Sequence, residues 1–113
     1  MKKIITLIAF FLVFQLQALA IDTLVVQTSA QCEMCKARLE NRIRKIAGIE
    51  SATLNLSNKE FHIVYDKSLI SPENIEIKIT EIGYDANQKL AKKAAYKRLP
   101  ACCRVDYQGE HAN

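Results

Sequence analysis

The chain is poor in residues that break or loosen structure, with three glycines and two prolines among 113 residues. Its charges nearly balance, with 16 Lys and Arg against 12 Asp and Glu, and half of its residues are hydrophobic. Disordered and low-complexity chains have a different composition, so both classes are excluded. The length allows one domain at most and leaves no room for a multi-layer enzyme with a deep substrate cleft.

Histidine is also scarce. His62 falls on the outward face of a predicted hairpin and His111 falls near the C-terminus, so we expect neither to be a metal ligand. Cysteine is frequent for so short a chain, and the four cysteines are Cys32, Cys35, Cys102 and Cys103.

A single long hydrophobic run lies near the N-terminus, at residues 4–14. It follows the basic pair Lys2-Lys3 and precedes the small-residue sequence Ala18-Leu19-Ala20, and these three parts are typical of a secretory signal peptide. The run is shorter than the ~20 apolar residues that a membrane-spanning helix needs. We therefore expect cleavage after Ala20 and a periplasmic or secreted protein without a membrane span.

Removal of residues 1–20 would take Lys2 and Lys3 and leave 14 basic and 12 acidic residues. This net charge of +2 is too small to indicate a nucleic-acid-binding protein. We expect a monomer that does not bind nucleic acid.

The spacing of apolar residues predicts the order β-α-β-β-α. Alternation predicts strands, helical spacing of Leu39, Ile43 and Ile46 predicts the first helix, and Ser71-Pro72 predicts the start of the second. The expected strands are residues 23–28, 49–56 and 61–65, and the expected helices are residues 35–47 and 72–82. A final strand at residues 84–87 would complete an α+β, ferredoxin-like βαββαβ sandwich, with two helices on one face of a four-stranded antiparallel sheet.

Three segments are expected: a signal peptide (1–20), a compact domain (21–88) and a tail (89–113). The tail is basic and alanine-rich, which predicts an extra helix over residues 89–99 that ends at Pro100. The Cys102-Cys103 pair follows, and residues 105–113 have the composition of a frayed end.

Cys32 and Cys35 lie between the first strand and the first helix. Free N–H groups at a helix N-terminus stabilise a thiolate, and Lys36 and Arg38 add positive charge, so we expect Cys35 to have the lower pKa. Two thiolates at this spacing can bind one soft cation such as Cu(I) or Zn(II). From the spacing alone, a metal site, a redox pair and a structural disulfide all remain open.

Two motifs resemble those of the heavy-metal-associated domain family: the loop at residues 28–35, which contains both cysteines, and the Gly-Tyr segment at residues 82–86. The resemblance covers residues 22–88. It implies a ferredoxin-like fold that binds one Cu(I), or in some members Hg(II), Zn(II) or Cd(II), through Cys32 and Cys35. The family includes copper chaperones, domains of metal-pumping ATPases and an exported mercury-binding protein, and the predicted signal peptide makes the last type the nearest in architecture.

The sequence departs from the family pattern in the loop, because Ala30 stands where the family usually has a methionine and Ser29 where it has a glycine. A methionine instead lies between the cysteines, and Met34 is either a third, thioether ligand or an exposed partner-facing residue. The resemblance implies that Tyr84 packs near the loop and limits its contact with water. A plain core role for Tyr84 is equally open.

Cys102 and Cys103 lie outside the family's usual domain. They are either a tail held by a disulfide, an unpaired thiol pair or additional metal ligands. A strand of ~4 residues leads ~13 Å away from the loop and a helix of ~11 residues returns ~16 Å. Cys102 and Cys103 could then reach Cys32 and Cys35 and form a site of three or four thiolates.

The sequence therefore predicts a binding protein and not an enzyme. The expected protein carries a soft cation, most favourably Cu(I), to a membrane metal transporter or efflux component, or sequesters it. The alternatives are a thiol–disulfide oxidoreductase and an interaction module stapled by zinc through all four cysteines.

Overall fold

The computed structural model describes residues 2–9 and 20–104. Residues 2–9 are helical. The other elements are β1 (Ile21–Gln27), α2 (Glu33–Arg44), β2 (Ile49–Asn55), β3 (Glu60–Asp66), α3 (Pro72–Ile82), α4 (Lys93–Lys97) and the 3₁₀ turn η1 (Ala101–Cys103).

Several sequence predictions concern residues outside the described ranges 2–9 and 20–104. Most of the predicted signal peptide, His111 and the frayed end at residues 105–113 lie outside the described residues. Among the helices that are described, none is long and apolar enough to cross a membrane.

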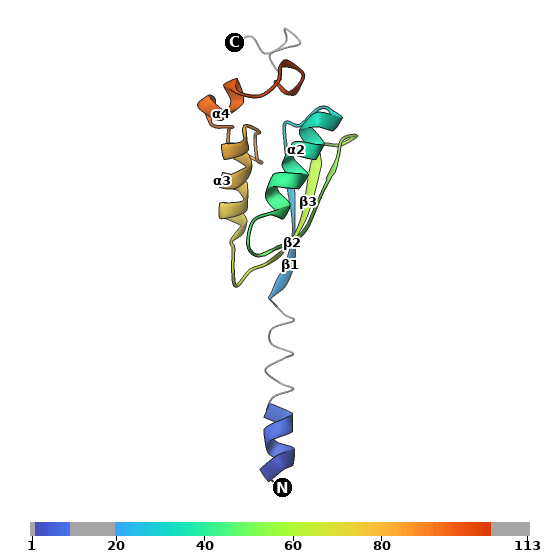
Figure 1. The fold of residues 1–113 in the computed structure, drawn as a ribbon, viewed down its shortest axis with the longest axis vertical. Coiled ribbons are helices and arrows are strands. Elements are labelled where there is room, and N and C mark those ends of the chain that lie inside the picture. Colours follow the sequence, from blue (N-terminus) through green and yellow to red (C-terminus); the bar gives the residue numbers. More distant parts are fainter. Residues whose placement is uncertain (1, 10–19, 105–113) are drawn as a thin grey trace.

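The sheet has the strand order β1-β3-β2, and both pairs of neighbouring strands are antiparallel. Helices α2 and α3 lie side by side on one face of it (Figure 1). Alternate residues of the strands and one stripe of each helix are buried between these layers: Val26, Ala52, Leu54, Phe61, Ile63, Tyr65, Leu39, Ile43, Ile75 and Ile79. The predicted α+β, ferredoxin-like order and its core are confirmed.

Helix α2 begins two residues earlier and ends three residues earlier than predicted. It begins early because Cys32 is the N-cap, with extended backbone and a sulfur that accepts the N–H of Cys35. After Arg44 the chain continues in tighter turns, in which the N–H of Ile46 donates to Ile43 and that of Ile49 donates to Ile46. Gly48 therefore lies beyond the helix and does not end it.

The expected fourth strand is reduced to a single bridge between Thr28 and Ala86 within the described residues. The N–H of Asn87 still donates to Gln27, but the N–H of Gln27 donates to the side chain of Asn87 instead of to a backbone carbonyl. Asn87 has a positive φ of 54°, and the chain then turns so that Ala86 and Lys89 pair with each other. This turn ends the pairing with β1 after one step, so the sheet has three strands.

Side chains of α2 cover the outer edge of β2. Lys36 Nζ donates to the Leu54 carbonyl at 2.7 Å, and Arg44 Nε donates to the Ala52 carbonyl at 3.0 Å. The N–H of Leu54 donates to Glu40 Oε2 at 2.8 Å. Glu40 is buried although it is not part of the apolar stripe of Leu39 and Ile43, because it satisfies this edge N–H and pairs with both cations.

The tail helix is shorter than predicted, since only α4 forms within residues 89–99. The turn at Ala86–Lys89 and the extended backbone of Lys92 leave no room for an earlier start. Ala95 and Leu99 are buried against the C-terminal end of α3, where an added Cβ on Gly83 would lie 3.1 Å from Leu99 and from the Ala95 carbonyl. The tail therefore packs on the domain, with α4 and η1 at the end of the molecule where α2 begins (Figure 1).

Candidate metal site

The loop after β1 ends at the two cysteines, and the start of α2 fixes their geometry. Cys32 is the N-cap and is half-buried, whereas Cys35 lies in the first turn and is fully buried. Their sulfurs are 2.9 Å apart, and all four cysteines are free thiols. The sequence-predicted pair is thus brought together at a helix N-terminus, with Cys32 the more exposed of the two.

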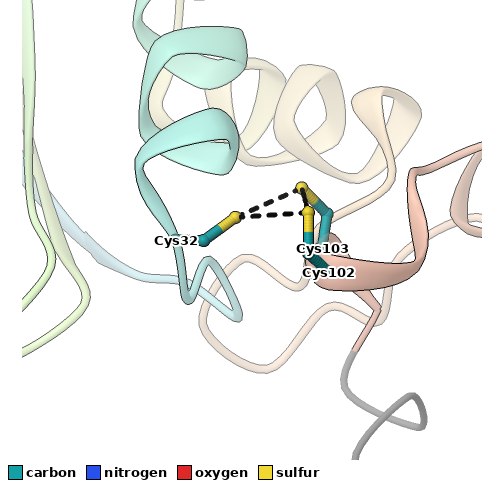
Figure 2. A group of neighbouring side chains, drawn as sticks. All are labelled: Cys32, Cys102 and Cys103. Carbon is teal, nitrogen blue, oxygen red and sulfur yellow. Dashed lines mark hydrogen bonds between the residues drawn. The ribbon is translucent and has the colours of Figure 1, made fainter.

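The tail adds two further sulfurs to this place. Cys103 Sγ lies 3.5 Å and Cys102 Sγ lies 3.9 Å from Cys32 Sγ, and these tail sulfurs are 4.0 Å from each other (Figure 2). Sulfurs of Cys32, Cys102 and Cys103 all lie within 4.8 Å of one another. Cys102 is exposed and Cys103 is buried. The route differs from the expected strand and long helix, because a tight turn, α4 and η1 return the chain instead.

Tyr84 and Arg38 lie beside the buried sulfurs. Tyr84 is fully buried, and burial followed by hydrogen bonds with Cys103 and Cys35 raises its pKa strongly. Arg38 Nη1 donates to the Tyr84 hydroxyl at 3.5 Å. Burial lowers the pKa of Arg38, but its hydrogen bond with Tyr84 and the charges of Tyr84, Cys103 and Cys35 raise it overall, so the guanidinium interacts with this group of side chains.

Lys36 and Met34, two further residues named from the sequence, make no described contact with the sulfurs. The Lys36 ammonium contacts the Leu54 carbonyl and Glu40, so it serves the β2 edge and makes no described contact with sulfur. Met34 is 51% exposed, as expected, and lies on the outer side of the first turn of α2. Of the two basic residues in the first turns of α2, Arg38 and not Lys36 therefore interacts with the buried thiols.

The helix N-terminus acts on a different cysteine from the one expected. Burial raises the pKa of Cys32, but hydrogen bonds from the Cys35 thiol and the Cys35 N–H, with smaller ones from Cys103 and Cys102, outweigh it and lower this pKa below its ordinary value. The pKa of Cys103 is strongly raised, first by burial and then by its hydrogen bond with Cys35. The N-cap position belongs to Cys32, whose sulfur accepts the Cys35 N–H.

Two polar contacts tie the loop to later segments and were not anticipated from the sequence. Ser29 Oγ accepts the N–H of Asp85 at 2.9 Å, which fixes the cysteine loop to the segment that carries Tyr84. Gln31 Nε2 donates at 3.2 Å to the carbonyls of both Cys102 and Arg104. Neither Ser29 nor Gln31 carries a signal that identifies its partner, because both partners are more than 50 residues away.

A pocket of about 250 Å³ lies beside the site, between α2, the end of α3 and α4. Three arginines line it together with Glu81 and apolar groups: Arg38, Arg42 and Arg98. The pocket is therefore basic.

Comparison with protein families matches residues 29–85, half of the chain, to the heavy-metal-associated domain. The chain belongs to the heavy-metal-associated domain family. The matched segment contains Cys32, Cys35 and Tyr84, whereas Cys102 and Cys103 lie beyond its end. Domains of this family bind metal ions and are generally not enzymes.

Two curated relatives are copper-transporting ATPases. The copper-exporting P-type ATPase of Staphylococcus epidermidis is 33% identical over 89 residues, which cover 74% of this chain and 11% of the ATPase. Copper-transporting ATPase 2 of Rattus norvegicus is 36% identical over 55 residues, which cover 49% of this chain and 4% of the ATPase. The chain thus corresponds to a short segment of each of these relatives.

Two solved structures share the fold over nearly their whole length. CopZ metallochaperone has a TM-score of 0.56 and 27% identity, and the match covers 57% of this chain and 98% of CopZ. Oxidised MerP from Ralstonia metallidurans CH34 also has a TM-score of 0.56, at 18% identity, and covers 60% of this chain and 96% of MerP. The heavy-metal-associated domain described here therefore has the fold of CopZ and MerP.

Proposed function

We propose that this heavy-metal-associated protein is exported, binds one soft cation between Cys32 and Cys35, and carries it to a membrane metal transporter. The observation that carries the proposal is the cysteine pair itself. Both thiols are free, their sulfurs are 2.9 Å apart, and one of them is half-exposed at a helix N-terminus. An incoming ligand would approach the ion at the half-exposed Cys32, beside the exposed Cys102 of the tail.

Cu(I) is the cation we favour. Thiolates select soft ions, and a two-thiolate site suits an ion that accepts low coordination numbers better than Zn(II), which usually takes four ligands. The two ATPases named above are copper transporters by name, and CopZ is a metallochaperone. Hg(II) meets the same two-thiolate condition and is the nearest competitor.

Transfer would proceed by thiolate exchange without any redox change. A partner thiol loses its proton to solvent and forms a sulfur–metal bond, and then the bond to Cys32 breaks and that sulfur takes a proton. The half-exposed position and lowered pKa of Cys32 suit both roles. The exposed thioether of Met34 and the pocket formed by Arg38, Arg42 and Arg98 would contact an acidic partner surface around the site.

The test uses the full-length chain expressed in a bacterium. Cell fractionation determines whether the protein is found in the periplasm, and mass spectrometry of the purified protein determines whether it begins at Ile21. Anaerobic titration of the reduced protein with Cu(I), Hg(II) and Zn(II), each against a chelator, then gives stoichiometry and affinity. We expect one tightly bound Cu(I), lost in the Cys32→Ser/Cys35→Ser variant and retained at lower affinity in the Cys102→Ser/Cys103→Ser variant, which removes the same number of thiols.

The two alternative functions give different results. Reduction of insulin that requires Cys32 would favour a thiol–disulfide oxidoreductase. Unfolding upon treatment with a zinc chelator would favour a zinc-stapled module, whereas a carrier must fold without its cargo. The hydrophobic core formed by β1, β2, β3, α2 and α3 supports folding without metal.

A further inference from the structure

The sulfurs of Cys32, Cys102 and Cys103 are spaced like ligands of one metal ion. A metal–sulfur bond of about 2.3 Å places two sulfurs on the same ion about 3.8–4.0 Å apart. The three observed separations are 3.5, 3.9 and 4.0 Å. The Cys32–Cys35 separation of 2.9 Å must open further than any of these to accept an ion.

Contacts that involve no metal hold the tail thiols in this position. Gln31 binds the carbonyls on both sides of Cys103, at Cys102 and Arg104. Leu99 packs against Gly83, and the N–H of Lys92 donates to the Thr80 carbonyl at the end of α3. The tail thiols are therefore positioned in advance, and binding an ion there costs little conformational entropy.

We propose that Cys102 and Cys103 form, with Cys32, a three-thiolate site that retains the soft cation after Cys32 and Cys35 have captured it. Cys32 is common to both ligand sets. In this step Cys102 and Cys103 lose their thiol protons to solvent and form two sulfur–metal bonds, and the bond to Cys35 breaks as that sulfur takes a proton. The oxidation state of the metal does not change. The inference rests on the proposed function, since it concerns the same ion.

The surroundings of Cys103 suit a thiolate bound to a cation. Three thiolates around Cu(I) carry a net charge of −2, and the Arg38 guanidinium beside Cys103 and Cys35 offsets part of it. Tyr84 lies against the same sulfurs and excludes water from the buried side. Cys102 closes the exposed side, so release to a partner requires the tail to lift.

The decisive experiment compares four versions of the full chain: wild type, Cys102→Ser/Cys103→Ser, Cys102→Ser alone and Cys32→Ser/Cys35→Ser. X-ray absorption spectroscopy gives the number of sulfurs on Cu(I), and competition with a chelator gives the affinity. We expect three sulfurs in the wild type and two in the tail double variant. We expect the tail double variant to lose at least about tenfold in affinity, since removing even a hydrogen-bonding partner of a ligand costs that much.

Because Cys103 is buried, its serine variant is checked for folding by far-UV circular dichroism, and Cys102→Ser supplies a second test at an exposed position. A further variant, Gln31→Ala, keeps all four thiols but removes both hydrogen bonds from the Gln31 side chain to the tail carbonyls. We expect Cu(I) to protect Cys102 from iodoacetamide in the wild type, and this protection to weaken in Gln31→Ala.

The outcomes separate the two proposals. If the wild type binds Cu(I) but the sulfur number and the affinity are unchanged in the tail variants, the three-thiolate site is wrong and the carrier function stands. If the wild type binds no soft cation at all, or the Cys32→Ser/Cys35→Ser variant binds it equally well, the carrier function itself is wrong.

Discussion

Two glycines with positive φ provide a matched test of whether α4 holds the tail on the domain. Gly83 has a φ of 123° and Gly48 a φ of 96°. A Cβ on Gly83 would lie 3.1 Å from Leu99 and from the Ala95 carbonyl, both in the tail. A Cβ on Gly48 would lie 3.0 Å from Leu69 Cβ, in the segment between β3 and α3.

Alanine at either position should destabilise the domain by a similar amount. The backbone conformation alone costs an L-residue about 1–2 kcal/mol, and the close contact adds to this. For a domain of this size, a loss of about 2 kcal/mol lowers Tm by about 8–16 °C. Thermal unfolding of the reduced, metal-free protein measures this loss, and equal stability of wild type and both variants would contradict the positive-φ argument.

The two variants should differ at the tail. Gly83→Ala pushes Leu99 and α4 away, so Cys102 and Cys103 should react faster with iodoacetamide than in the wild type, and the Cu(I) affinity should fall. Gly48→Ala should leave both properties unchanged at a temperature where it is folded. Alkylation rates read by tandem mass spectrometry decide the matter. If both variants react alike, packing of α4 on Gly83 does not position the tail thiols.

Three further predictions concern single side chains. Glu40→Gln should lower the free energy of unfolding by about 1–2 kcal/mol near neutral pH, because the hydrogen bond to Leu54 N–H weakens and both ion pairs are lost. The control Glu50→Gln, at a residue for which no ion pair is described, should change this free energy little. Burial raises the pKa of Glu40, but Leu54 N–H and Lys36 lower it below 4.5 overall. The stability that the ionised Glu40 contributes at neutral pH is therefore lost as pH falls through this lowered pKa. In urea titrations, the difference in free energy of unfolding between wild type and Glu40→Gln should disappear over that pH range, and a constant difference would contradict the assignment. Tyr84→Phe should keep the fold and lower the free energy of unfolding by about 1 kcal/mol, since the ring still fills the core and only the hydroxyl contacts with Arg38 and the sulfurs are lost. A decrease as large as that caused by deleting a core side chain would disprove this interpretation. In the metal-free protein, Cys32 should be alkylated well before Cys103. Cys32 is half-exposed and has a lowered pKa, whereas Cys103 is buried and has a raised pKa. The reverse order in a mass-spectrometric time course would overturn the assigned N-cap role of Cys32.

Local sequence signals predicted the parts of the fold that depend on nearby residues. Alternation located Phe61, Ile63 and Tyr65 in the core, and Ser71 was recognisable as an N-cap because its hydroxyl acts only three residues ahead, on Asn74. The burial of Glu40 was missed because its partner Leu54 lies on another element.

Distant contacts also explain the errors in the tail. The fourth strand ends after one bridge because the Asn87 side chain replaces a backbone acceptor for Gln27, and no local pattern shows this. At the site, the cysteine spacing identified Cys32 and Cys35, but which sulfur receives the helix N–H depends on whether the helix begins at residue 33 or 35. The helix begins at Glu33 because Cys32 is its N-cap, and the loop before it is fixed to a distant segment by the contact between Ser29 and Asp85.

The cover that α2 places over β2 also affects how copies of this protein can associate. The outward carbonyls of Ala52 and Leu54 and the N–H of Leu54 are already hydrogen-bonded to side chains of their own chain. A strand from a second molecule would have to displace three charged groups to extend the sheet there. In concentrated solution, growth of the sheet by strand addition is therefore blocked along β2 at Ala52 and Leu54.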